Sequence, residues 1–219
     1  MLIFLNYYLC PGGEVIVDQE KKECYLYIYK NGTRSLHQLL DNGPNYIHYN
    51  GNELTEFLNY HGVDELTVFL RDPIDRIISA IYTQSQMYKI PVDVVEEFIN
   101  SDKICLPIQD QHTIPQFWYL LRAAENNSNL KFKLKPLSEI NNIDNIGHLN
   151  AHPKHKIRNL NLNDRALNKL DFLYTEDVVL FNQFLNTTTT VNEIIKQIKL
   201  EKSFIDTVKE YQHQLTYLL

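Results

Sequence analysis

The stretch LTVFLRDPIDRIISAIY, residues 66–82, contains one strand pattern followed at once by one helix pattern. The apolar run of residues 66–70 has strand length, and such a continuous run is typical of a strand covered on both faces. Asp72 fits the N-cap position of a helix, and Pro73 fits its first turn. Four isoleucines then recur at helical spacing: Ile74, Ile77, Ile78 and Ile81. This spacing predicts an amphipathic helix that packs one stripe on a sheet.

Strand and helix patterns alternate around this unit. Residues 23–29 predict an aromatic strand, and a short helix is expected over residues 34–42. A strand at residues 45–49 and an amphipathic helix at residues 51–61 complete the alternation, which indicates a parallel sheet with crossover helices. The other expected elements are a strand or hairpin through residues 2–9 and 14–18, helices at 93–100, 115–126, 164–173, 175–185 and 192–218, a strand at 131–135 and a loop at 187–190.

Length and composition favour a single core. The chain has 219 residues, of which 44% are hydrophobic, and this is enough for one domain but short for two. No internal repeat or low-complexity linker divides it. We therefore expect one α/β domain over residues 1–219, with a central parallel sheet flanked by helices and a helix-rich C-terminal half.

Charge and cysteine usage narrow the functional classes. A net charge of −6 argues against a nonspecific nucleic-acid binder, which usually carries a basic excess, but it allows a small anionic ligand. Three cysteines without CxxC spacing indicate a reduced intracellular protein. His152 and His155 come nearest to metal-ligand spacing, but no second pair lies nearby, so we expect no metal.

The apolar segments of the chain are short. None reaches the ~18 residues of a membrane span. The opening MLIFLNYYLC has no basic leader and no cleavage pattern, so we interpret it as a first strand and not as a secretory signal. A cytoplasmic protein is expected.

A charged, hydroxyl-rich turn, YKNGTRS at residues 29–35, follows the aromatic strand. A loop from a parallel strand to a helix presents backbone N–H groups and a helix N-terminus to the ligand crevice. Gly32 lets the backbone approach an anion closely. Thr33 and Ser35 add hydroxyl donors, and Lys30 adds a positive charge. These residues fit a phosphate cradle, and they also fit a polar turn capped by a hydroxyl with its lysine in solvent.

Arg71 places a second cation at the end of the apolar strand, and Ser79 follows about two turns into the next helix. Because the carboxyl ends of parallel strands share one edge of a sheet, Arg71 and Lys30 are expected at the same edge. An arginine there can bind a phosphate with two hydrogen bonds. The alternative is an ion pair of Arg71 with Asp72 or Asp75, and a serine chosen for its small size.

In this order the two segments resemble the sulfotransferase family. Its members carry a PKxGTTSL-like loop and an RDPxxRxxSxxY-like segment, and the corresponding stretches here are YKNGTRSL and RDPIDRIISAIY. The loop departs twice, because Tyr29 replaces the usual proline and Arg34 stands where threonine or serine is common. QDQHTIPQFWYL and FLYTEDVVLFNQF resemble segments of the carbohydrate-type branch. The resemblance extends over residues 23–185 and is nearest to compact bacterial or phage members.

The resemblance implies a P-loop-like three-layer fold and a sulfotransferase that uses 3′-phosphoadenosine 5′-phosphosulfate (PAPS) as donor without a metal. The acceptor would be a hydroxyl on a carbohydrate or another small molecule. Lys30 would be catalytic by stabilising charge on the leaving phosphate oxygen. The implied donor-binding residues are Lys30, Asn31, Gly32, Thr33, Arg34 and Ser35 at the 5′-phosphosulfate, and Arg71 and Ser79 at the 3′-phosphate.

An acceptor hydroxyl also requires a general base. In enzymes of the sulfotransferase family, which this chain resembles, the base is often a histidine or glutamate between the two donor segments. His48 occupies that place here. The ordinary pKa of a histidine suits proton abstraction near neutral pH. Glu53 and His112 are the rival candidates.

Three further features have two interpretations each. His112 and Gln116 either contact the donor or acceptor, or form a local helix cap. Arg76 either adds to the phosphate site or pairs with Asp72 one turn earlier. A late basic stretch either covers the nucleotide or is a solvated charged surface; its cations are Lys154, Lys156 and Arg158.

Two other functions stay open. A P-loop kinase of a small metabolite would need a lysine after the second glycine of its loop and groups that bind Mg²⁺. A degenerate nucleotide-binding fold could serve as an interaction module, and Arg34 is the best support for it. The expected partner is a small-molecule or glycan acceptor, with no nucleic acid and no membrane span, in the cytoplasm, or in the host cytoplasm if the chain is viral.

Overall fold

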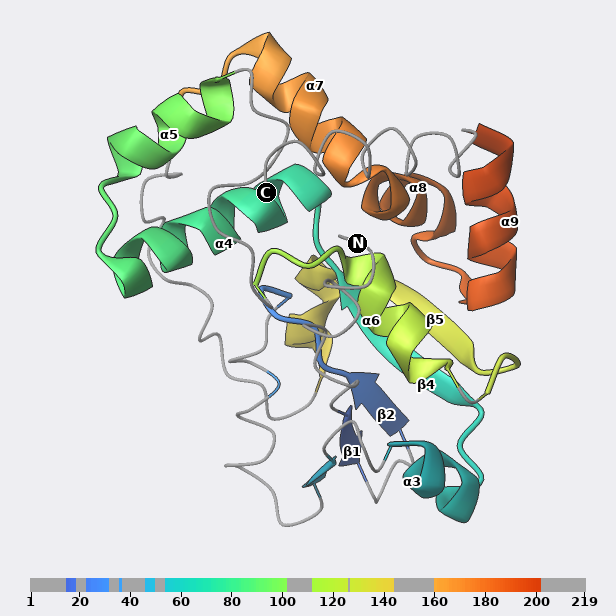
Figure 1. The fold of residues 1–219 in the computed structure, drawn as a ribbon. Coiled ribbons are helices and arrows are strands. Elements are labelled where there is room, and N and C mark those ends of the chain that lie inside the picture. The colour runs from blue at the N-terminus through green and yellow to red at the C-terminus, as the bar shows by residue number, and fades with distance from the viewer. Residues whose placement is uncertain are drawn as a thin grey trace.

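A computed structural model of the chain describes residues 15–18, 23–31, 36, 46–49, 54–101, 112–125, 127–143 and 160–201. These residues form a six-stranded sheet with helices packed around it, in the strand order β3-β1-β2-β4-β5-β6 (Figure 1). The strands are β1 (Val15–Asp18), β2 (Glu23–Leu26), β3 (Tyr46–Tyr49), β4 (Glu65–Leu70), β5 (Lys131–Pro136) and β6 (Thr188–Thr190).

The helices account for most of the second half of the described chain. They are α3 (Leu54–His61), α4 (Pro73–Tyr88), α5 (Val92–Asn100), α6 (Gln116–Ala123), α7 (Asp164–Leu173), α8 (Thr175–Phe184) and α9 (Val191–Glu201), with the 3-10 helix η2 (Leu137–Asn142) after β5. They coincide closely with the helices expected from sequence between residues 51 and 185. The strand expected at 2–9, most of the helix at 34–42 and the last part of the helix at 192–218 lie outside the described residues. Within the described ranges, no helix is both long and apolar enough to cross a membrane.

The sheet is mixed, whereas the alternation of elements predicted a parallel sheet. Only the central pairs β2–β4 and β4–β5 are parallel. Strand β1 is antiparallel to both β2 and β3, and β6 is antiparallel to β5. The prediction fails between β1 and β2 because the four residues that link them are too few for a parallel crossover, which needs a dozen or more.

The tetrathreonine segment was expected to be a loop and is instead the edge strand β6. Thr188, Thr189 and Thr190 pair with the start of β5. Threonine is β-branched and suits a half-buried pleated edge, so strand pairing decided its conformation once β5 was present.

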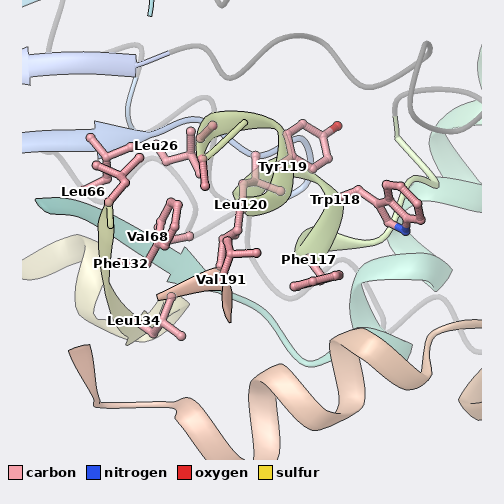
Figure 2. Close-up of a cluster of buried hydrophobic side chains, with 14 of the residues drawn as sticks. Leu26, Leu66, Val68, Phe117, Trp118, Tyr119, Leu120, Phe132, Leu134 and Val191 are labelled. Carbon is pink, nitrogen blue, oxygen red and sulfur yellow. The ribbon is translucent and has the colours of Figure 1, made fainter. Parts of the chain in front are cut away.

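Both faces of β4 are covered, as its continuous apolar sequence predicted. Leu66, Val68 and Leu70 belong to the main core, which also includes residues of β5 and of helices α6, α8 and α9 (Figure 2). Phe69 points into a second cluster on the other face, together with Tyr25 of β2 and Ile140 of η2. Strands β2 and β4 are thereby held at a fixed spacing and direction, which fixes where their carboxyl ends lie.

Helix α4 begins as predicted, but its apolar stripe packs against other helices and not against the sheet. The Asp72 carboxylate accepts a hydrogen bond from the Asp75 N–H at 2.9 Å, and Pro73 occupies the first turn. Ile77 and Ile81 pack with residues of α5 and α7 and not on the sheet, so the expected sheet contact of this stripe is wrong. Figure 1 shows α4, α5 and α7 grouped beyond the end of β4. Helices α5 and α7 supply the apolar surface against which the isoleucine stripe packs. The opposite, polar face of α4 is therefore turned toward the sheet edge.

Replacing Ile77 with alanine tests this arrangement. Ile77 is fully buried between α4, α5 and α7, so Ile77→Ala should lower the free energy of unfolding by about 2–5 kcal/mol in urea denaturation. Val94→Ala, at a half-exposed position on α5, is the control and should change it by less than about 0.5 kcal/mol. Equal effects of the two variants would contradict the packing of α4 against α5 and α7.

Candidate functional site

Two chain segments meet at the carboxyl edge of the central strands. Strands β2 and β4 are parallel neighbours, with Tyr25 opposite Thr67. After β2 the chain turns at Lys30, where the Asn31 N–H donates to the Ile28 carbonyl at 3.1 Å. After β4 the chain passes through Arg71 into α4. Lys30 and Arg71 therefore lie at the same edge, as the sequence predicted.

The turn that carries Lys30 has an unusual backbone. Lys30 has φ of 70°, which places it in the left-handed region at the third position of a four-residue turn. Glycine or asparagine usually occupies that position, because a Cβ there costs about 1–2 kcal/mol. Strain of this kind persists only where surrounding contacts determine the conformation.

Those contacts come from the next residue. Asn31 is buried, and its Nδ2 donates to the Phe69 carbonyl at 2.7 Å and to Oε1 of Gln116 at 2.5 Å. Oε1 of Gln116 also accepts from the Arg71 N–H at 3.0 Å, and its Nε2 donates to the Arg71 carbonyl at 3.0 Å. One amide thus joins the turn after β2 to the end of β4.

Gln116 was expected either to contact the donor or acceptor or to form a cap. Its Oε1 has two donors and its Nε2 reaches two acceptors, the second being Oδ2 of Asp177 at 3.4 Å. This occupies the hydrogen-bonding capacity of the amide. In this arrangement Gln116 positions the two segments.

Asp177, a residue that the sequence analysis did not single out, anchors Gln116. Its carboxylate accepts from the N–H groups of Gln116 at 2.7 Å and Phe117 at 2.8 Å, and so caps α6 from α8. Burial raises the pKa of Asp177, while the charge of Arg76 and the hydrogen bonds from Gln116 and Phe117 lower it. The available signal was an aspartate directly before the apolar run VVLF in FLYTEDVVLFNQF, because aspartate is rarely fully buried unless it has partners.

Two desolvated arginines lie beside this network. Arg76 is fully buried, and its Nε donates to the Tyr29 carbonyl at 3.1 Å. Its backbone N–H donates to the Asp72 carbonyl at 2.9 Å, whereas the Asp72 carboxylate accepts from the Asp75 N–H and caps α4. Burial lowers the pKa of the half-buried Arg71; the positive charge of Arg76 lowers it further, while Asp75 and Asp72 oppose the shift. The edge therefore holds positive charge that is poorly solvated.

The polar face of α4 also reaches Lys30. The Lys30 ammonium donates to the Thr83 hydroxyl, which itself donates to the Ser79 carbonyl at 3.2 Å. Ser79 is half-buried on this face, so it lies near Lys30 as well as on the helix that begins after Arg71. The ring of His112 packs edge-on against the ring of Tyr29, with centroids 5.1 Å apart, which places His112 next to the turn.

His48 lies farther away. Its strand β3 is antiparallel to β1, with His48 opposite Ile16, and β1 separates β3 from β2. Two antiparallel pairings in succession give β3 the same direction as β2, so its carboxyl end is at the same edge. The lateral separation of the two strands is about 10 Å, or two strand spacings.

Several predicted site residues lie outside the described residues: Gly32, Thr33, Arg34, Ser35, Glu53, Lys154, Lys156 and Arg158. In the part of the chain that is described, no group of three or more histidine, cysteine, aspartate or glutamate side chains is placed to hold a metal ion. No family model, curated protein or solved structure matches this chain. The cations gathered at one sheet edge are therefore the feature that bears on function, and they suit an anionic ligand.

Asp177→Asn tests the positioning network. The asparagine NH₂ would oppose one of the two backbone N–H donors, so the free energy of unfolding should fall by about 1–3 kcal/mol. Asp171→Asn on the exposed surface of α7 is the matched control and should have little effect in the same urea titration. If both variants were equally stable, the network would not hold the α6 terminus.

Proposed function

We propose that this protein is a PAPS-dependent sulfotransferase with a P-loop-like three-layer fold, and that its acceptor is a hydroxyl on a carbohydrate or other small molecule. One observation carries the proposal. The turn after β2 and the start of α4 converge at one edge of parallel strands, where they gather Lys30, Arg71 and Ser79. This is the arrangement that the two resembling sequence segments require, and the crevice at such an edge is where ligands of open α/β sheets bind.

In the proposed reaction the acceptor oxygen attacks sulfur in line with the bond to the 5′-phosphate. The new S–O bond forms as the bond from sulfur to the bridging phosphate oxygen breaks, and adenosine 3′,5′-bisphosphate leaves. Lys30 stabilises the charge that develops on that oxygen, and the proton of the acceptor passes to a general base. Arg71 and Ser79 hold the 3′-phosphate, and residues 32–35 hold the 5′-phosphosulfate. Asn31 was expected to join them, but its donors are engaged by Ile28, Phe69 and Gln116, so it positions the turn. The late basic cations Lys154, Lys156 and Arg158 cover the nucleotide.

Two histidines compete for the role of base. His48 has the place in the sequence that the resemblance assigns to the base, and its strand ends at the same edge as β2. His112 contacts Tyr29 beside the Lys30 turn. We assign the base to His48, because it occupies the place between the two donor segments that the resemblance gives to the base, and we keep His112 as a contact of the acceptor.

Donor binding separates this proposal from a kinase. Adenosine 3′,5′-bisphosphate without metal should raise the melting temperature more than ATP–Mg²⁺ does, because only the former carries a 3′-phosphate for Arg71. Arg71→Ala should weaken its binding about 10–100-fold in calorimetry, the effect of losing charged hydrogen bonds, and Ser79→Ala should weaken it less. Arg122→Ala, a surface arginine paired with Glu125 on α6, should bind normally. Stabilisation by ATP–Mg²⁺ alone would overturn the sulfotransferase proposal in favour of the kinase.

His48→Ala tests the base. Transfer of labelled sulfuryl from PAPS, to an acceptor found by screening glycans, lipids and phenols, should fall about 10²–10⁴-fold. The affinity for adenosine 3′,5′-bisphosphate should stay unchanged. His61→Ala, an exposed histidine at the end of α3, should transfer at the normal rate. Normal transfer by His48→Ala would move the role to His112.

A further inference from the structure

The buried guanidinium of Arg76 is only partly satisfied. Its Nε donates to the Tyr29 carbonyl, but Nη1 and Nη2 have no hydrogen-bond partner among the described residues. The side chain is fully buried, so water does not hydrate it from an exposed surface. A buried charge without complete hydrogen bonding is costly, and in native proteins such a group calls for a specific explanation.

The surroundings of Arg76 do not neutralise it. Arg71 is a like charge that is itself desolvated, and the two guanidinium groups repel each other. Asp177 interacts with Arg76 electrostatically, but its carboxylate oxygens are bound by the backbone N–H groups of Gln116 and Phe117. Asp72 and Asp75, which act on Arg71, are exposed at the start of α4, and the buried carboxylate of Asp177 is already hydrogen-bonded. The buried Nη1 and Nη2 donors of Arg76 are therefore unused within the described residues. An anion satisfies both the charge and the donors, whereas a water molecule satisfies only the donors.

The position of Arg76 points to the ligand of the proposed active site. The carbonyl that it binds belongs to Tyr29, the residue before Lys30. On α4, Arg76 lies on the polar face that carries Ser79 and Thr83, opposite the isoleucine stripe. It is therefore placed between the turn assigned to the 5′-phosphosulfate and the arginine assigned to the 3′-phosphate.

We propose that Arg76 is a third cation of this site and that its Nη1 and Nη2 donate to phosphate oxygens of the bound nucleotide. This inference rests on the proposed function for the identity of the nucleotide, but the anion site itself does not require it. Occupancy by a phosphate group would pair the buried charge, so ligand binding and fold stability are coupled through this residue.

Arg76→Gln is the decisive variant. Glutamine Nε2 occupies the place of arginine Nε, so the bond to the Tyr29 carbonyl is kept while the charge, Nη1 and Nη2 are removed. The affinity for adenosine 3′,5′-bisphosphate, measured by calorimetry, should fall at least about 10-fold. Arg76→Lys keeps the charge but not the two-pronged donor, and it should recover part of the affinity. Arg165→Gln, on the exposed surface of α7, should bind normally.

The melting temperature is a second measurement, and it distinguishes a ligand-binding role of Arg76 from a purely structural role. Without ligand, Arg76→Gln should be about as stable as the natural protein, because removal of a buried charge with two unsatisfied donors offsets the lost attraction to Asp177. With ligand it should lose most of the stabilisation. Unchanged affinity in Arg76→Gln, or in Arg76→Lys if the glutamine variant does not fold, would overturn the inference and assign Arg76 to the support of Asp177.

Pyrophosphate and inorganic phosphate separate this inference from the proposed function. If the natural protein binds these anions through Arg76 but does not bind adenosine 3′,5′-bisphosphate, the anion site stands and the sulfotransferase proposal fails. If it binds adenosine 3′,5′-bisphosphate with no dependence on Arg76, the opposite holds. If it binds none of the three probes, both fail.

Discussion

The side-chain amide of Gln116 is the contact on which the candidate site depends. It bonds the Asn31 side chain on one side and both main-chain groups of Arg71 on the other, and so it locks two segments that belong to different strands. The Asp177 carboxylate holds the start of α6 and thereby keeps the Gln116 amide in place. Because the side chains of Asn31, Gln116 and Asp177 are buried, a shift in one would leave a partner unsatisfied, and that cost keeps the left-handed turn at Lys30 in place.

The electrostatics of the edge follow from this rigidity. Parallel strands bring the two segments together, and burial removes much of the water around Arg71 and Arg76. Cations in such an environment interact with an anion far more strongly than they would in solvent. Buried cations of this kind add little stability to the ligand-free fold. A multiply charged anion would pair them and so stabilise the protein on binding.

Helix α4 contacts α5 and α7 on one side and the sheet edge on the other. Its isoleucine stripe is buried against α5 and α7, which leaves the face with Arg76 and Thr83 for the sheet edge. Had the stripe packed on the sheet, as expected from its spacing, those polar side chains would have faced away from Lys30. Helices α5 and α7 are therefore part of the reason that the site has its polar composition.

The sequence by itself determined the local elements and the order of the cations. The extent of β4, the Asp72 cap and the place of Arg71 after a strand depend on neighbouring residues, so their periods and caps can be predicted without the fold. The tertiary structure decided the mixed sheet, the partners of the isoleucine stripe, and the network of Asn31, Gln116 and Asp177. That network joins residues 85 and 61 positions apart. No local pattern encodes such bonds, because a buried polar group gains its partner only from the packing that brings distant elements together.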